Sequence, residues 1–289
     1  TGWYNTSQTS VFTYTDGLST SCLIATEGAN QTCSVTPNLC DLAGNCNTTT
    51  VTSNPANQDF TNPLVSAGTD QIRNILFSQT GTVSDALSGL ASTLWSQVSG
   101  PGTITFGTAN ALTTTISANV DGNYVIQLLA TDNAGNTATS TFNLAWDVTA
   151  PVGSVVINGG AANTTNANVT LTLSATDNLT GVAFMAFSND NVTYSANQAY
   201  ATTAAWTLIS GNGNRTVYVR YTDVAGNTST SIFSDDIILD TLAPVVTWVN
   251  PVANANLTGT SVTLNATATD IGGSGIASLT YAVSGGTFT

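Results

Sequence analysis

The chain has 289 residues, of which 42% are hydrophobic and only 7% are charged, and its formal net charge is −13. Since soluble domains usually carry about 25% charged residues, the exposed surface must consist largely of Thr, Ser, Asn and Gly. Three arginines and no lysine predict no binding of nucleic acid, and no apolar run reaches the ~18 residues that predict membrane insertion, so cations are the partners that the charge favours.

All four cysteines lie near the start of the chain, in a predicted short unit at residues 1–58. Four cysteines allow three pairings, of which the spacing favours Cys22–Cys33 and Cys40–Cys46. Each pair flanks a short turn, and its two cysteines are expected to face each other across a hairpin. Two disulfides, at about 2–4 kcal/mol each, would compensate for a small core and indicate an oxidising, extracellular setting. A metal site is the alternative, but the chain has no histidine and no Cys-x-x-Cys spacing.

The second predicted unit, residues 59–146, begins at the segment DFTNP and contains a clear strand pattern. In the run YVIQLLA at 124–130, residues of one face alternate with those of the other, which predicts a half-buried strand. Proline in the opening segment suits a linker or the start of an edge strand. The sequence therefore predicts a β domain that starts at Asp59.

The third and fourth predicted units, residues 147–239 and 240–289, open with the related segments DVTAP and DTLAP. Period-two alternation recurs in the runs at 169–177, 215–223 and 261–270. Short strands with frequent turn signals and no helical periodicity predict an all-β fold of sandwich type.

A turn of nearly constant sequence, written CDLAGN, TDNAGN and TDVAGN, occurs three times. Its aspartates Asp41, Asp132 and Asp223 are 91 residues apart (132 − 41 and 223 − 132), and a fixed period predicts tandem domains. Each Asp is expected to accept hydrogen bonds from its own turn, and Gly and Asn accept the positive φ that closes a hairpin. These turn positions are Gly44, Asn45, Gly135, Asn136, Gly226 and Asn227.

The frame D-x-x-A-P, V-T-L-x-x-x-A-T-D and V-x-V-R-Y-T-D-x-A-G-N resembles the bacterial Ig-like repeats of large surface proteins and adhesins. It covers residues 147–240 and, for its first half, 240–289. Residues 59–146 depart from it, because LWSQVSGPGTITF and DGNYVIQLLATDNAGN look more like a PKD- or REJ-type Ig-like module with Trp95 as core tryptophan. The resemblance implies tandem Ig-like β-sandwich domains arranged as beads on a string, with incomplete units at both ends. The first unit is expected to lack its first strand.

The sequence predicts no enzyme. Without histidine, the commonest general base is absent, and no Ser/His/Asp or Cys/His arrangement can form. Asp235 and Asp236 are adjacent on a predicted strand, so their carboxylates point to opposite faces and make a poor acid–base pair. Catalytic residues are therefore not assigned.

Calcium is the cofactor that the acidic residues favour. Each boundary aspartate should lie near a loop aspartate and a turn aspartate of the domain that it enters, and three converging carboxylates would repel without a hard cation. The simpler interpretation, which accounts for most of the pattern, is that each Asp only caps its own turn and that the three carboxylates do not converge. The predicted sets are Asp59 with Asp85 and Asp132, Asp147 with Asp177 and Asp223, and Asp240 with Asp270.

These observations predict a non-enzymatic spacer of a long extracellular or cell-surface fibre, in which each repeat adds length and contacts neighbouring repeats. One alternative is a subunit of a self-assembling filament, joined by strand complementation between like chains. Another is a carbohydrate-binding module for host or cell-surface glycans, with aromatic platforms. The candidate aromatic residues are Trp3, Tyr4, Tyr194, Tyr200 and Trp206.

Overall fold

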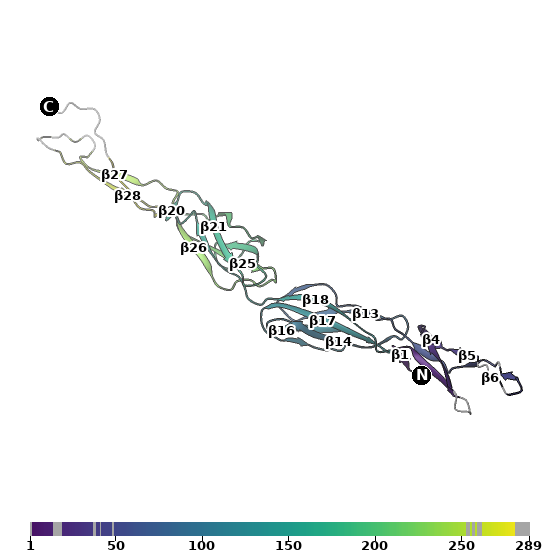
Figure 1. Ribbon diagram of the computed structural model, residues 1–289. Coiled ribbons are helices and arrows are strands. Elements are labelled where there is room, and N and C mark those ends of the chain that lie inside the picture. Colours follow the sequence, from purple (N-terminus) through teal and green to yellow (C-terminus); the bar gives the residue numbers. More distant parts are fainter. Residues whose placement is uncertain are drawn as a thin grey trace. The chain divides into compact units, whose positions relative to one another are not determined.

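The structure, a computed structural model, describes residues 2–13, 19–36, 39–40, 42–47, 49–252, 255, 258 and 262–280. The described residues form strands, turns and loops, as Figure 1 shows, and none of them belongs to a helix that could cross a membrane. The predicted all-β, Ig-like architecture is confirmed. The chain divides into two compact units, residues 1–148 and 149–289, which are called the first unit and the second unit from here on. The finer division into the four domains predicted from the sequence stays a prediction.

The first unit starts with an N-terminal module, residues 2–58, made of small sheets ordered β1-β9-β4, β2-β3, β5-β8 and β6-β7. Ile24 is the one hydrophobic residue of the described part of this module that is fully buried. Its strands are β1 (Trp3–Tyr4), β2 (Gln8–Thr13), β3 (Ser19–Ile24), β4 (Gly28–Gln31), β5 (Ser34–Val35), β6 (Leu39–Cys40), β7 (Cys46–Asn47), β8 (Val51–Thr52) and β9 (Ala56–Gln58).

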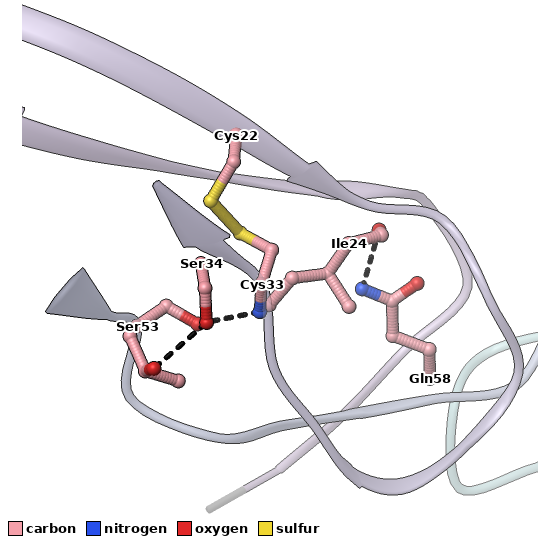
Figure 2. Close-up of a disulfide and its surroundings, with 7 residues drawn as sticks. Cys22, Ile24, Cys33, Ser34, Ser53 and Gln58 are labelled. Atoms are coloured by element: carbon pink, nitrogen blue, oxygen red, sulfur yellow. Dashed lines mark hydrogen bonds between the residues drawn. A yellow bond between two sulfur atoms is a disulfide. The ribbon is translucent and has the colours of Figure 1, made fainter. Parts of the chain in front are cut away.

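Both favoured disulfides of the N-terminal module are formed. Cys40 and Cys46 are direct partners across the β6–β7 hairpin, as expected. The expectation that Cys22 and Cys33 also face each other across a hairpin is wrong, because β3 pairs with β2 while β4 pairs with β9. Figure 2 shows that this disulfide instead joins β3 to the chain that leads into β5.

The central domain, residues 59–146, is a sandwich of the sheets β11-β18-β17-β14 and β12-β16-β15, with β10 and β13 paired beside them. The predicted alternation at 124–130 is confirmed, since Tyr124, Ile126, Leu128 and Ala130 are all 0% exposed. Its strands are β10 (Leu64–Ser66), β11 (Gln71–Arg73), β12 (Phe77–Thr80), β13 (Thr82–Ser84), β14 (Leu90–Ser99), β15 (Ile104–Phe106), β16 (Thr113–Ala118), β17 (Gly122–Asp132) and β18 (Thr137–Trp146).

Trp95 anchors the core of the central domain, as the sequence predicted. Its side chain is 2% exposed, its ring meets Phe142 edge to face with centroids 6.1 Å apart, and its indole N–H donates to the carbonyl of Ala111 at 2.9 Å. An aromatic pair of this geometry stabilises a core beyond the burial of its area.

The second unit contains a further sandwich, of the sheets β19-β21-β24 and β20-β26-β25-β22-β23. Val217, Val219 and Tyr221 on β25 are buried, while Arg220 between them is exposed, so the predicted alternation is confirmed here also. The strands are β19 (Val152–Ile157), β20 (Asn163–Thr164), β21 (Asn168–Thr176), β22 (Val182–Ser188), β23 (Gln198–Ala199), β24 (Thr203–Thr207), β25 (Gly213–Asp223) and β26 (Phe233–Leu239).

Beyond this sandwich, β27 (Val245–Asn250) and β28 (Asn265–Thr269) form an antiparallel pair. Several of their apolar side chains are exposed, among them Trp248, at 50%. Asp16 and Asp41, the loop and turn aspartates of the N-terminal module, lie outside the described residues.

Candidate metal centre

Three aspartates that are far apart in the sequence lie together in the first unit. Asp59, Asp85 and Asp132 each offer a carboxylate oxygen, and these oxygens lie within 4.8 Å of one another. Asp59 is 0% exposed and Asp132 is 1% exposed, while Asp85 is half-buried. This is the set that the sequence grouped at the entrance to the central domain.

The first two carboxylates are held by backbone N–H groups. Asp59 follows β9, and its Oδ1 accepts from Thr61 N at 3.1 Å, while its Oδ2 accepts from Ser88 N at 2.9 Å. Asp85 follows β13, and its Oδ2 accepts from Gly89 N at 2.6 Å. The loop after β13 therefore bonds both carboxylates.

The turn aspartate is held by an asparagine whose role differs from the predicted one. Gly135 has φ +95°, as expected, but Asn136 is not among the residues with positive φ. Instead, Asn136 donates its backbone N–H to Asp132 Oδ1 and its side-chain amide to Asp132 Oδ2, both at 2.8 Å. The same amide lies 2.8 Å from the carbonyl oxygen of Asp59, so one residue joins the turn to the domain boundary.

The same correction applies at the other turns. Gly44 and Gly226 have φ of +87° and +98°, whereas neither Asn45 nor Asn227 has positive φ. Asn227 donates its side-chain amide to Asp223 Oδ2 at 2.7 Å and its backbone N–H to Asp223 Oδ1 at 2.8 Å.

Among the residues of the first unit that the structure describes, no cationic side chain is bonded to this cluster. Arg73, the one arginine there, donates to the carbonyl of Ile72 and lies over the ring of Phe77. Backbone and amide dipoles thus surround three like charges, and oxygen-only ligands of this kind suit a hard cation such as Ca²⁺. The residues fit such an ion through their carboxylate oxygens.

In the second unit, Asp177 and Asp223 also offer oxygens within 4.8 Å of each other. Asp177 Oδ2 accepts three backbone N–H groups of its own loop, whereas its Oδ1 is buried and has no hydrogen-bond partner. Asp147, the boundary aspartate predicted to join them, is buried and belongs to the first unit. The set of three at that joint stays a prediction.

Asp240 and Asp270 form the last predicted set, and the loop after β28 donates hydrogen bonds to both carboxylates. Asp240 Oδ2 accepts from the backbone N–H of Ser274 at 3.2 Å and from its hydroxyl, while Asp270 Oδ2 accepts from Gly275 N at 2.7 Å. The Ser274 hydroxyl, and after it the Leu242 N–H, lower the pKa of Asp240 below its ordinary value.

The predicted aromatic platforms are mostly engaged in packing. Tyr200 meets the buried Tyr221 edge to face, and Tyr194 lies under the guanidinium of Arg220 at 3.9 Å. Trp206 instead borders a groove of about 380 Å³, which is lined by Asn168, Asn189, Ala205, Trp206 and Thr207.

Two stretches of the chain match known families. Residues 75–145 match the K319L-like PKD domain, and residues 244–289 match the bacterial Ig domain. The predicted PKD-like module is thereby confirmed for residues 75–145, and the predicted bacterial Ig-like repeat is confirmed for residues 244–289. Domains of these families are typically extracellular and non-catalytic.

Two of the solved structures that match this chain are described as modules or tandem repeats. Fibronectin(III)-like modules of Clostridium thermocellum CbhA share 15% identity, with a TM-score of 0.35, over 61% of this chain and 93% of theirs. A tetra-tandem repeat from the extending region of a large adhesion protein shares 16% identity, with a TM-score of 0.30, over 92% and 80%. No curated protein has a significantly similar sequence. The assignment therefore rests on the two family matches and on the strands of the chain itself.

Proposed function

We propose that the chain is a non-enzymatic spacer of an extracellular surface fibre or adhesin. The observation that carries this proposal is the presence of PKD-like and bacterial Ig-like domains in one chain whose turn motif repeats every 91 residues. Both complete sandwiches bury cores of their own, as a domain needs if it is to add length independently of its neighbours.

Duplication of residues 147–239 tests the spacer. Because the longest strand of this domain has 11 residues, each added copy should lengthen the chain by roughly 35–40 Å, at about 3.4 Å per strand residue. Small-angle X-ray scattering would measure the increase in maximum dimension. An unchanged dimension argues against the spacer, and polymers that grow with concentration would support the filament alternative.

We further propose that Ca²⁺ binds to Asp59, Asp85 and Asp132. Their proximity and the oxygen-only ligand set support this, as does the partnerless, buried Oδ1 of Asp177 in the corresponding loop of the second unit. A ligand that binds only the folded state stabilises it by about 2.7 kcal/mol at a concentration of 100 Kd. Bound calcium would also fix the chain where it enters the central domain.

Thermal unfolding across a calcium titration tests this ion site. The Tm should rise with calcium in the native chain, and Asp132→Asn should reduce the rise. Asp190→Asn is a matched control, because that carboxylate bonds only to its own turn, through Ser188, Val192 and Thr193. A flat response of the native chain would show that the three aspartates only cap their turns.

The groove beside Trp206 favours a second candidate function, carbohydrate binding. Its polar groups are fixed in place: the indole N–H donates to Asn189 Oδ1 at 2.9 Å, and the Thr207 hydroxyl donates to Asn168 Oδ1 at 2.9 Å. An aromatic ring beside oriented amides suits a pyranose ring, which has one apolar face and a polar edge.

A glycan array tests the groove. Trp206→Ala should abolish binding, while Trp248→Ala, at a half-exposed tryptophan outside the groove, should not. Because Trp206 also packs against Phe187, Asn168→Ala provides a second variant, at an exposed strand position. No binding by the native chain would dismiss this candidate.

A further inference from the structure

A short strand pairs in parallel with the last strand of its own domain at three places along the chain: β1 with β9, β11 with β18, and β20 with β26. At each place, the next residue is a boundary aspartate, and its backbone N–H continues the parallel ladder. Asp59 donates to Tyr4 O at 3.0 Å, Asp147 to Arg73 O at 3.0 Å, and Asp240 to Thr164 O at 2.9 Å.

The side chains of Asp59 and Asp240 repeat one arrangement that reaches forward along the chain. In both, Oδ1 accepts the N–H of the residue two positions later, Thr61 or Leu242. In both, Oδ2 accepts the N–H of a serine in the loop of the following domain, Ser88 at 2.9 Å or Ser274 at 3.2 Å. These aspartates are 0% and 5% exposed, so water competes little for their hydrogen bonds.

The parallel pairing decides how tension would act on each domain. Pulling the chain ends apart draws the short strand toward the N-terminal end and the last strand toward the C-terminal end, so the two strands are pulled in opposite directions along their common axis. The ladder bonds between them are then loaded together rather than one after another. The boundary aspartate directly follows the last strand, so the applied force passes through it from one domain to the next.

We propose that Asp59 and Asp240 are connectors that transmit tension, each joining the terminal ladder of one domain to a loop of the next. The backbone N–H holds the preceding domain and the carboxylate holds the following one, so tension passes into folded structure rather than into the free linker. This inference rests on the proposed spacer function, and it requires no bound ion, because the hydrogen bonds are made by the protein alone.

Constant-force tweezers on the full chain, held by its two ends in EDTA, test the connector. Asp59→Ala removes the carboxylate and keeps the N–H, so the lifetime before the first opening should fall at least ~tenfold, as expected for two hydrogen bonds to a charged group. Asp190→Ala is the matched control, since it also loses a bonded carboxylate, but one confined to a local turn. Its lifetime should match that of the native chain.

Amide hydrogen exchange without load checks that Asp59→Ala still folds. The N–H of Ser88 should lose protection, while the ladder of the central domain keeps it. If exchange shows that pattern, an unchanged lifetime of Asp59→Ala under force would overturn the connector proposal and leave the spacer function unaffected. A chain that fails to lengthen when its domain is duplicated would instead overturn the spacer function. Equal losses of lifetime in the Asp59 and Asp190 variants would also overturn the connector.

Discussion

The N-terminal module and the central domain are neighbours in one compact unit but are stabilised in different ways. The central domain buries a core of ten residues around Trp95, whereas Ile24 alone is fully buried among the apolar residues of the described N-terminal module. That module contains both disulfides of the chain. Cross-links therefore replace burial where the chain segment is too short to enclose a core.

The two regions also differ in what carries their hydrogen bonds. In the central domain, the strands β14, β17 and β18 have 10 or 11 residues each and form long ladders, with the register between β14 and β17 shifting at two places. In the N-terminal module, side chains take over part of this role: Gln58 donates to the carbonyl of Ile24 at 2.7 Å, and Ser53 accepts from Cys33 N at 3.1 Å (Figure 2). The comparison predicts different responses to core truncation, disulfide removal and acid.

Truncation of the core should have the largest effect. Trp95→Ala removes the more deeply buried of the two core tryptophans of the central domain and should cost about 3–5 kcal/mol of its free energy of unfolding. Leu94→Ala is the matched control, because Leu94 is the adjacent residue of β14 and is 46% exposed, so its loss should be far smaller. Denaturant unfolding followed by circular dichroism measures both, and equal losses would contradict the core assignment.

Removal of the Cys22–Cys33 disulfide should have the next largest effect, and only in the N-terminal module. The double substitution to alanine opens a loop of 11 residues and should cost about 2–4 kcal/mol. Removing Cys40–Cys46, whose sequence separation is 6, should cost less, because a shorter loop restricts the unfolded chain less. Amide exchange in β2 and β3 reports the loss, and faster exchange in β17 instead would show that the two regions do not unfold separately.

Much of this comparison was predictable from sequence because its signals are local. The alternation at 124–130 identified a buried strand face, the 91-residue period identified tandem domains, and cysteine spacing favoured the pairing that the structure contains. Each depends on residues close together in the chain or on exact repetition. The burial of Trp95 followed from its place in a recognisable module.

Other features escaped prediction because they depend on tertiary contacts. The parallel strands β1, β11 and β20 have only two or three residues, too few for a periodic pattern. Ser88 holds Asp59 through its backbone N–H, which any residue type except proline would supply. The residue type of Asn136 predicts a turn, yet its amide also bonds the domain boundary. The sequence signal for this role is that an Asn follows the Asp in all three copies of the turn.

Acid should have the smallest of the three effects on stability, and we expect it in the central domain through Asp70. Asp70 Oδ2 accepts the side-chain amide of Asn143 at 3.0 Å and its Oδ1 accepts the backbone N–H at 2.7 Å. These bonds, the side-chain one first, hold the pKa of Asp70 below its ordinary value of 3.8. A lowered pKa in the folded state stabilises the central domain above pH 3.8, and this contribution is lost as the pH falls through the lowered value. The disulfides of the N-terminal module do not titrate.

Asp70→Asn should therefore flatten the acid slope of central-domain stability below pH 3.8, with a small effect because the carboxylate is exposed. Asn143→Ala is the matched partner variant: it removes the side-chain bond and keeps the backbone one, so the slope should fall to an intermediate value. Thermal unfolding at a series of pH values measures each slope. If Asn143→Ala left the slope unchanged, the backbone N–H alone would hold the Asp70 pKa low. If neither variant changed it, the acid response of this domain would arise at other carboxylates, and the contrast with the disulfide-linked module would have to rest on burial alone.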